Sequence, residues 1–92
     1  MNDQRINKLR LELRRGVLIL SVLASSKVPQ YGYSLRKHLS EAGIEIDEGT
    51  LYPLIRRLAE QELLDSEWKN TDGRERRYYL LSDKGHAVLG QL

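Results

Sequence analysis

Basic side chains cluster around a predicted turn in the last third of the chain. Lys69, Arg74, Arg76 and Arg77 flank residues 70–73 (Asn-Thr-Asp-Gly), whose types favour a tight turn. Cations on an exposed hairpin can bind phosphate groups and can straddle the minor groove of DNA. The alternative is an ordinary charged edge that discourages aggregation. The chemistry that this cluster predicts is anion binding.

A second group of candidate residues lies on a helix predicted over residues 48–62. Its apolar residues share one side at 100° per residue, which leaves the other side free for a partner. We expect Arg56 to contact guanine or phosphate in a major groove, and Thr50 and Tyr52 to donate to phosphate oxygens near the helix N-terminus. Alternatively, Tyr52 and Pro53 pack against the preceding helix and Arg56 is merely solvated. The outward side is predicted to carry Gly49, Tyr52, Pro53 and Arg56, flanked by Arg57.

The sequence holds no pattern typical of an enzyme. It has no cysteine, and its two histidines, His38 and His86, fall on different predicted elements. No glycine-rich phosphate loop follows a predicted strand. We therefore expect no catalytic residue, no metal site and no cofactor.

The elements that must position these groups follow from periodicity, caps and turn residues. Helices are predicted over about 3–25, 31–42, 48–62 and 84–92, and strands over 64–69 and 76–81. Asp47 is expected to cap the third helix, and Ser82 or Asp83 the fourth. Gly43 is expected to end the second helix in the left-handed conformation. The alternating segment Ile44–Ile46 is predicted as a very short strand.

The predicted hairpin carries three aromatic residues. Tyr78 and Tyr79 alternate, so one is expected in the core and the other toward solvent or a partner. Trp68 is expected to pack against the third helix. Gly32 and Gly49 are expected to allow close approach of the backbone to another helix or to phosphate.

The first helix carries two apolar stripes, whereas a surface helix of a monomer buries only one. Either this helix lies at the centre of its own domain, or it contacts a second copy, above all over residues 17–23. A chain of 92 residues has a thin core, which favours a homodimer. The residues predicted at the dimer interface are Leu11, Leu18, Val22, Val88, Leu89 and Leu92.

The element order is helix, helix, short strand, helix, strand, strand, helix. This order predicts an α+β chain that is mainly helical with a small β-hairpin, a winged helix-turn-helix. Residues 1–82 are predicted to form the winged helix-turn-helix domain with its N-terminal helix. Residues 83–92 are predicted as a short C-terminal helix that contributes to dimerisation.

The net charge of +2, from 15 Lys and Arg against 13 Asp and Glu, conceals an uneven distribution. Residues 5–15 and 69–77 are basic, while residues 41–48 are acidic, and such polarity steers charged ligands. The longest apolar stretch, 16–24, is far shorter than the ~20 residues of a membrane span. Together with the absence of cysteine and of a secretory pattern, this predicts a cytoplasmic protein.

Several short motifs together resemble the PadR-like family of transcriptional regulators, over about residues 16–89. The most specific are Gly49–Leu54 (GTLYPL), the downstream pair Gly73-Arg74, and Arg77–Tyr79 (RYY). The remaining matches are Tyr31–Tyr33 (YGY), Arg57-Leu58, Trp68 and Gly85.

The resemblance implies a homodimeric repressor with a winged-helix DNA-binding domain, often relieved by a small molecule. It implies that Gly49–Pro53 opens the recognition helix, that Gly73-Arg74 is the wing tip, and that the Tyr31–Tyr33 segment borders the DNA backbone. The expected partners are double-stranded DNA and a second copy, with an effector of unknown identity. The alternative is a protein-interaction module without specific DNA binding. The predicted DNA contacts are Tyr31, Tyr33, Gly49, Thr50, Tyr52, Pro53, Arg56, Arg57, Lys69 and Arg74.

Overall fold

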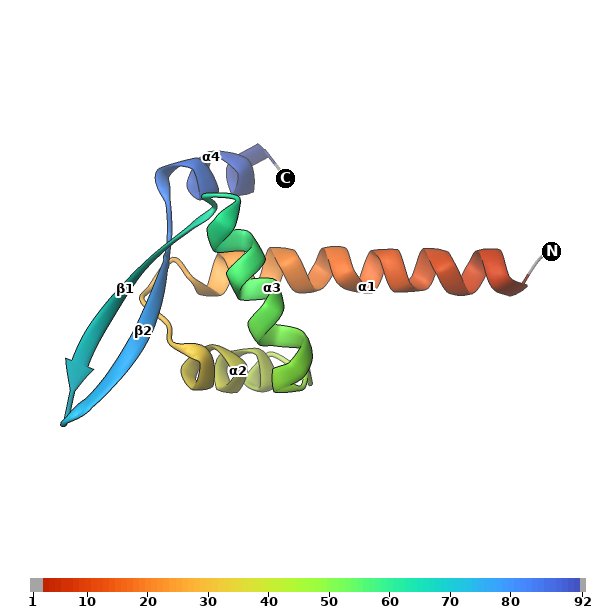
Figure 1. The fold of residues 1–92 in the computed structure, drawn as a ribbon. Coiled ribbons are helices and arrows are strands. Elements are labelled where there is room, and N and C mark those ends of the chain that lie inside the picture. Colours follow the sequence, from red (N-terminus) through yellow and green to blue (C-terminus); the bar gives the residue numbers. More distant parts are fainter. Residues whose placement is uncertain (1–2, 92) are drawn as a thin grey trace.

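Four helices and one β-hairpin follow one another in the computed structural model, which describes residues 3–91 (Figure 1). This is the α+β architecture predicted for a winged helix-turn-helix. The helices are α1 (Asp3–Ser25), α2 (Gly32–Glu41), α3 (Glu48–Glu60) and α4 (Asp83–Gln91). The strands are β1 (Leu64–Thr71) and β2 (Arg74–Leu81).

Helix α1 is much longer than the body that it joins, and its N-terminal part extends away from that body (Figure 1). Its C-terminal part packs into the domain, where Val22 is 0% exposed and Leu23 is 1% exposed. The prediction that Val22 faces a second copy is therefore wrong, because its side chain is consumed by the core of its own chain. Although α1 has 23 residues, neither it nor any other helix within residues 3–91 is apolar enough to cross a membrane.

The hydrophobic core lies where α1, α2, α3 and the base of the hairpin meet. Tyr79 is buried there while Tyr78, on the other face of β2, is half-buried, which confirms the predicted alternation. The buried apolar side chains are Val22, Leu23, Leu35, Leu39, Leu51, Leu54, Ile55, Leu58, Leu64, Tyr79 and Leu81.

The hairpin pairs β1 with β2 in antiparallel register from Leu64 opposite Leu81 to Thr71 opposite Arg74. Its tip is the pair Asp72-Gly73, with φ of 53° and 76°. Positive φ at both central residues is the geometry of a type I′ turn, for which Asp-Gly is a preferred sequence. The strands thus extend further toward the tip than predicted and carry Lys69 and Arg74 outward.

A third segment pairs with β2, in a place that the sequence analysis did not predict. The amide of Gln30 donates to the carbonyl of Tyr79 at 2.9 Å, and the amide of Tyr79 donates back at 2.7 Å. The amide of Leu81 donates to the carbonyl of Ser26 at 2.7 Å. Strand β2 is therefore hydrogen-bonded on both edges near its base, which holds the hairpin against the loop before α2.

The predicted strand at Ile44–Ile46 is wrong. Gly43 has a φ of 86°, and the amide of Ile44 donates to the carbonyl of Leu39 at 2.8 Å, so this residue completes the C-terminal cap of α2. The carbonyl of Ile46 accepts a hydrogen bond from Arg36. The alternation of the two isoleucines instead turns both side chains toward the core.

Ser82 caps α4 and joins it to the end of α3. Its hydroxyl accepts a hydrogen bond from the amide of Gly85 at 2.9 Å and donates to the carbonyl of Glu62 at 2.6 Å. Gly85 itself is buried, and a Cβ built on it would collide with the carbonyl oxygen of Leu63. Of the two predicted caps, Ser82 is the one used.

Candidate nucleic-acid interface

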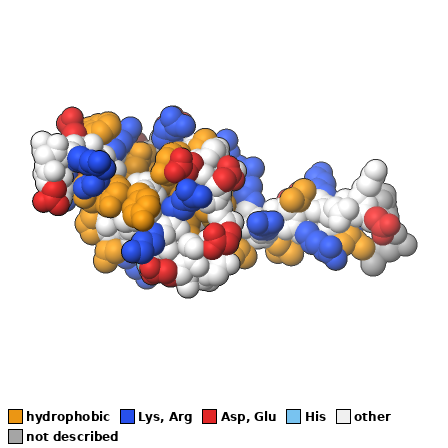
Figure 2. Space-filling view, turned by 90° about the horizontal axis from the view of Figure 1, so that it is seen from below, with side chains coloured by type: hydrophobic (Ala, Val, Ile, Leu, Met, Phe, Trp, Pro, Cys, Tyr) orange, Lys and Arg blue, Asp and Glu red, His pale blue; other side chains and the backbone are white. Residues whose placement is uncertain are grey.

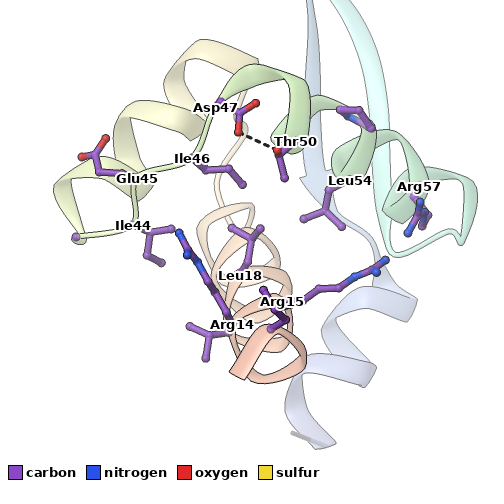
Figure 3. Close-up of a pocket in the computed structure, with 14 residues that line it drawn as sticks. Arg14, Arg15, Leu18, Ile44, Glu45, Ile46, Asp47, Thr50, Leu54 and Arg57 are labelled. Carbon is purple, nitrogen blue, oxygen red and sulfur yellow. Dashed lines mark hydrogen bonds between the residues drawn. The ribbon is translucent and has the colours of Figure 1, made fainter. Parts of the chain in front are cut away.

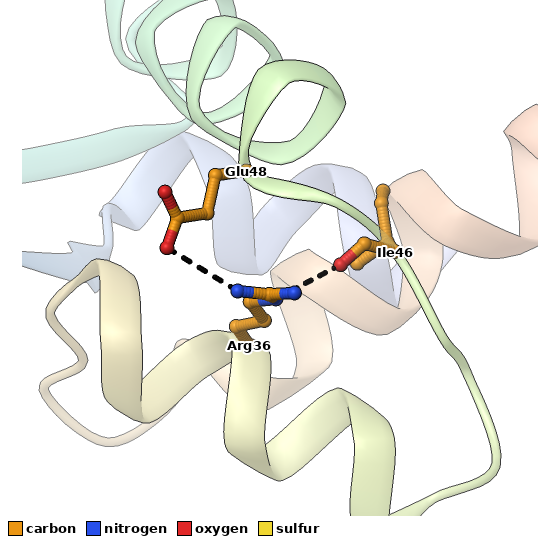
Figure 4. A network of polar contacts seen from close by, with 3 residues as sticks. All are labelled: Arg36, Ile46 and Glu48. Atoms are coloured by element: carbon orange, nitrogen blue, oxygen red, sulfur yellow. Dashed lines mark hydrogen bonds and ion pairs between the residues drawn. The ribbon is translucent and has the colours of Figure 1, made fainter.

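The angle between α2 and α3 is held by Arg36. Its Nε donates to the carbonyl of Ile46 at 3.0 Å, and its Nη1 pairs with Glu48 Oε1 at 3.2 Å (Figure 4). Both side chains are largely exposed, so the ion pair itself adds little stability. Its effect is to position the first turn of α3 relative to α2, which orients the rest of the helix.

The described residues of α3 divide among three sides of the helix. Leu51, Leu54, Ile55 and Leu58 are buried, as predicted. Arg56 is exposed and borders a groove of about 380 Å³ between α3 and β1. Thr50, Pro53 and Arg57 border a different groove, which faces α1. The predicted contact residues of this helix therefore do not form one continuous surface.

Tyr52 lies against the N-terminus of α2, which is the alternative that the sequence left open for this residue. It is half-buried, and a Cβ built on Gly32 would lie 2.7 Å from its Cε1 atom. Gly32 is thus required for close packing of α2 on α3. The Tyr52 ring supports the helix pair, while Gly49 and Pro53 remain exposed on α3.

Thr50 and Asp47 form a local contact at the start of α3. The Thr50 hydroxyl donates to Asp47 Oδ1 at 2.8 Å. This hydrogen bond holds the pKa of the Asp47 carboxyl below its usual range, with smaller contributions from backbone amides, while partial desolvation opposes the shift. Asp47 occupies the predicted N-cap position, but its carboxylate accepts from the Thr50 hydroxyl rather than from a helix amide.

Replacing Thr50 by valine should raise the pKa of Asp47 toward its ordinary value, because the main interaction that favours the charged form is removed. A depressed pKa in the folded state adds stability above the unfolded-state pKa, and this stability is lost as the pH falls through the folded-state pKa. The variant should therefore lose less stability than the wild type on acidification. Carboxyl ¹³C shifts followed against pH measure the change, and Thr71→Val is the control. An unaltered Asp47 titration would show that the hydroxyl is not the cause.

Aromatic and basic side chains gather where the hairpin meets the N-terminus of α2. The rings of Tyr31 and Tyr33 stack at 6.3 Å between centroids, and Tyr78 meets Tyr31 edge-on at 5.3 Å. Arg76 Cζ lies 4.8 Å above the Tyr31 ring, and Lys69 Nζ lies 5.4 Å from the Tyr78 ring. We call these five residues the aromatic–basic cluster.

The aromatic–basic cluster presents cations that are held in place by rings rather than by carboxylates. Tyr33 is 63% exposed, so its hydroxyl can reach a partner. Figure 2 shows Lys and Arg side chains interspersed with hydrophobic ones where the hairpin joins the body. Cation–π contact keeps a guanidinium positioned while leaving its N–H groups free to bind an anion.

The outer half of the hairpin is more open than predicted. Trp68 is 62% exposed, so the expectation that it packs against α3 is wrong. Lys69 pairs with Glu67 at 3.4 Å on the same strand, and Arg74 is exposed next to the turn. An exposed tryptophan between basic residues is available for contact with a partner molecule.

The geometry described so far is matched by known proteins. Residues 19–91 match the model of the "Transcriptional regulator PadR-like family". The chain belongs to this family. It is 38% identical over 81 residues to the transcriptional regulator Rv3488 of Mycobacterium tuberculosis, covering 85% of this chain and 74% of that protein.

Solved structures of PadR-like regulators share the fold closely. A PadR family transcriptional regulator from Eggerthella lenta is 47% identical with a TM-score of 0.82, covering 97% of this chain and 80% of that one. A PadR-like transcription factor from Bacteroides fragilis is 36% identical with a TM-score of 0.79, covering 91% and 84%. The family consists of transcriptional regulators, not enzymes. Within residues 3–91, no group of three His, Cys, Asp or Glu residues could hold a metal ion.

The structure places the residues that were predicted at a PadR-like dimer interface in different environments. Leu11 is exposed, Leu18 is half-buried against the core, and Val22 is fully buried. Val88 and Leu89 are half-buried on α4, and Leu92 lies outside the described residues. The exposed apolar side chains of α1 instead belong mostly to its other stripe: Leu9, Leu13, Val17 and Leu20.

Two residues of the aromatic–basic cluster were missed as site residues by the sequence analysis. Arg76 was noted only as one of several basic residues, and Tyr78 only as an alternating partner of Tyr79. The signal that could have found them is their position opposite Lys69 and Glu67 in the hairpin register. That register puts Lys69, Arg76 and Tyr78 on one face, toward Tyr31.

Proposed function

We propose that this chain is a sequence-specific DNA-binding transcriptional repressor that acts as a homodimer. Helix α3 enters the major groove and the wing, residues 69–77, lies on the backbone or in the minor groove. The observation that carries the proposal is the aromatic–basic cluster, which joins the wing to the N-terminus of α2 beside the exposed side of α3. A rigid wing next to a free helix face is the arrangement by which winged helices bind duplex DNA.

The roles of the contact residues follow from their chemistry. Arg56 is exposed on α3 and can form two hydrogen bonds to one guanine. Tyr31, Tyr33, Lys69, Arg74 and Arg76 can bind phosphate groups, which position the protein on the duplex without reading its sequence. The amide groups at the start of α2 add donors at the same edge.

Dimerisation is supported by the exposed stripe of α1. Leu13 is 70% exposed and Val17 is 54% exposed, and they share a face with Leu9 and Leu20. Contiguous apolar residues on a projecting helix mark a protein interface. Two copies that join through this stripe would present two α3 helices to successive major grooves, about one helical turn apart.

Replacing Arg56 by alanine should weaken binding to the operator by about tenfold or more, because one bidentate base contact per subunit is lost. Fluorescence anisotropy with DNA from the region upstream of the protein's own gene measures the change. Arg10→Ala on α1 is the matched control and should bind as the wild type does. A reporter under the same DNA should be expressed more strongly when the protein is absent, and an unaltered reporter would refute repression.

The second candidate function is a protein-interaction module. The exposed Trp68 on the hairpin favours it, since tryptophan is common at protein interfaces. The same anisotropy experiment separates the two. Absence of binding to any DNA at ~50 mM salt, where electrostatic affinity is strong, would support the interaction module.

A further inference from the structure

We propose that a groove between α1 and α3 binds a small organic anion with an apolar body, and that this binding weakens the interaction with DNA. The α1–α3 groove is formed by residues 11–18 of α1, the loop 43–47 and residues 50–57 of α3 (Figure 3). The binding site stands on its own geometry. Only the effect on DNA rests on the function proposed above.

The size and floor of the groove suit a small molecule. Its volume is about 820 Å³, within the ~300–1,000 Å³ range of ligand pockets. The floor is made by Leu18, Ile44, Ile46 and Leu54, which point toward one another from all three segments (Figure 3). An apolar body of one or two rings can therefore be covered on several sides.

Three arginines surround this apolar floor. Arg14, Arg15 and Arg57 line the groove, and none of them forms a hydrogen bond or ion pair with any residue from 3 to 91. Figure 3 shows Arg15 extending across the groove toward the side on which Arg57 lies. Guanidinium groups that converge without a carboxylate between them repel one another, and an anion placed there would relieve that repulsion.

The two carboxylates at the groove are engaged elsewhere. Glu45 Oε1 accepts a hydrogen bond from the Ser40 hydroxyl at 2.6 Å, and Asp47 Oδ1 accepts one from Thr50 at 2.8 Å. In Figure 3 the Glu45 carboxylate points away from the apolar floor. The charge that faces the groove is therefore positive, and it selects a carboxylate, sulfonate or phosphate group on the ligand.

A second copy of the chain is a poorer occupant than a small anion. At 100° per residue, Leu13 and Val17 lie on the side of α1 opposite Leu11 and Leu18. A dimer built on the exposed stripe thus leaves the α1–α3 groove open. DNA is also a poor occupant, because a phosphate backbone has no apolar part to place on Leu18 and Leu54.

The groove is shared with the proposed recognition helix. Thr50, Pro53 and Arg57 come from α3, so a ligand contacts this helix directly. A bound anion adds negative charge beside α3 and occupies the Arg57 guanidinium. Both effects oppose the approach of phosphates, which gives the sign of the regulation.

A matched pair of fluorescent probes tests the site. 8-Anilinonaphthalene-1-sulfonate has an apolar body and one sulfonate, and N-phenyl-1-naphthylamine has the same body without the charge. The double variant Arg14→Gln/Arg15→Gln should bind the sulfonate about tenfold or more weakly, while its affinity for the uncharged probe stays unaltered. The variant Arg5→Gln/Arg10→Gln, with the same net charge, should bind both probes as the wild type does.

Amide shifts and DNA binding supply the remaining outcomes. The sulfonate should shift amide signals of residues 43–47 and 50–57, and it should lower the DNA affinity of the wild type but not of Arg14→Gln/Arg15→Gln. Unaltered sulfonate binding by that variant would overturn the site. Unaltered binding with a weakened dimer would assign the groove to a second copy. Loss of sulfonate binding without any effect on DNA would retain the site and overturn the regulation. If the wild type binds no DNA, the probe titrations still decide the site.

Discussion

Replacing Gly85 by alanine should lower the free energy of unfolding by about 3 kcal/mol, the upper end of the range for overpacked cores. The added Cβ would collide with the carbonyl oxygen of Leu63 and would lie 2.6 Å from Leu81 Cδ1. The carbonyl belongs to the backbone, so it cannot turn aside as a flexible side chain can. Relief of the collision would require α4 to move away from the end of α3, which strains the Ser82 cap.

Urea denaturation followed by circular dichroism measures this loss, and Gly90→Ala is the matched control. Gly90 lies on the same helix, and a Cβ there meets no atom within 4 Å. The control should leave the stability unaltered or raise it by up to about 1 kcal/mol through helix propensity. Equal behaviour of the two variants would contradict the packing of α4 described above.

Replacing Leu13 by glutamate should convert the dimer into a monomer and lower the affinity for operator DNA by about 100-fold or more. A dimer places both half-sites under one binding event, and this gain is lost when the subunits separate. Leu13 is the most exposed of the apolar residues on its stripe of α1, so the substitution leaves the core intact. The new carboxylates would face each other or apolar surface across the interface, where an unpaired charge is costly.

Sedimentation equilibrium measures the change in assembly, and anisotropy with operator DNA measures the change in affinity. Asn7→Glu is the control, since it adds the same charge on an exposed position of α1 outside the stripe. The control should remain dimeric and lose little affinity. A wild type that is monomeric at the concentrations where it binds DNA would refute the proposed dimer.

Most of the fold could be predicted from local sequence signals. Periodicity located α1 and α3, Gly43 marked the end of α2, and Asp-Gly marked the turn of the hairpin. These signals act within a few residues of one another, so they are readable without knowledge of the tertiary structure. The short motifs then identified the family, which the comparisons confirm.

The errors share a physical cause, because each depended on contacts between distant segments. Ile44–Ile46 alternates as a strand does, but its backbone groups are taken by Leu39 and Arg36. Val22 lies on an apolar stripe, and only the packing of α2 and α3 decides that this stripe is buried within one chain. Trp68 would have been placed correctly only by knowing how far the hairpin extends beyond the body.

The candidate site was predictable in composition but not in arrangement. Arg56 and Tyr33 are exposed, in agreement with a contact role that stays a prediction. The sequence could not reveal that Tyr52 supports α2, nor that Arg57 faces α1 while Arg56 faces the hairpin. These differences arise from the side of α3 on which each neighbouring element packs.

Hydroxyl-radical footprinting of the upstream DNA tests the central claim, that two α3 helices and their wings bind one operator, most directly. The account predicts two protected patches whose centres are about one helical turn apart, with further protection where the wings meet the backbone. Both patches should fade together in Arg56→Ala. A footprint with a single patch, or full protection by Arg56→Ala at wild-type concentration, would contradict the account.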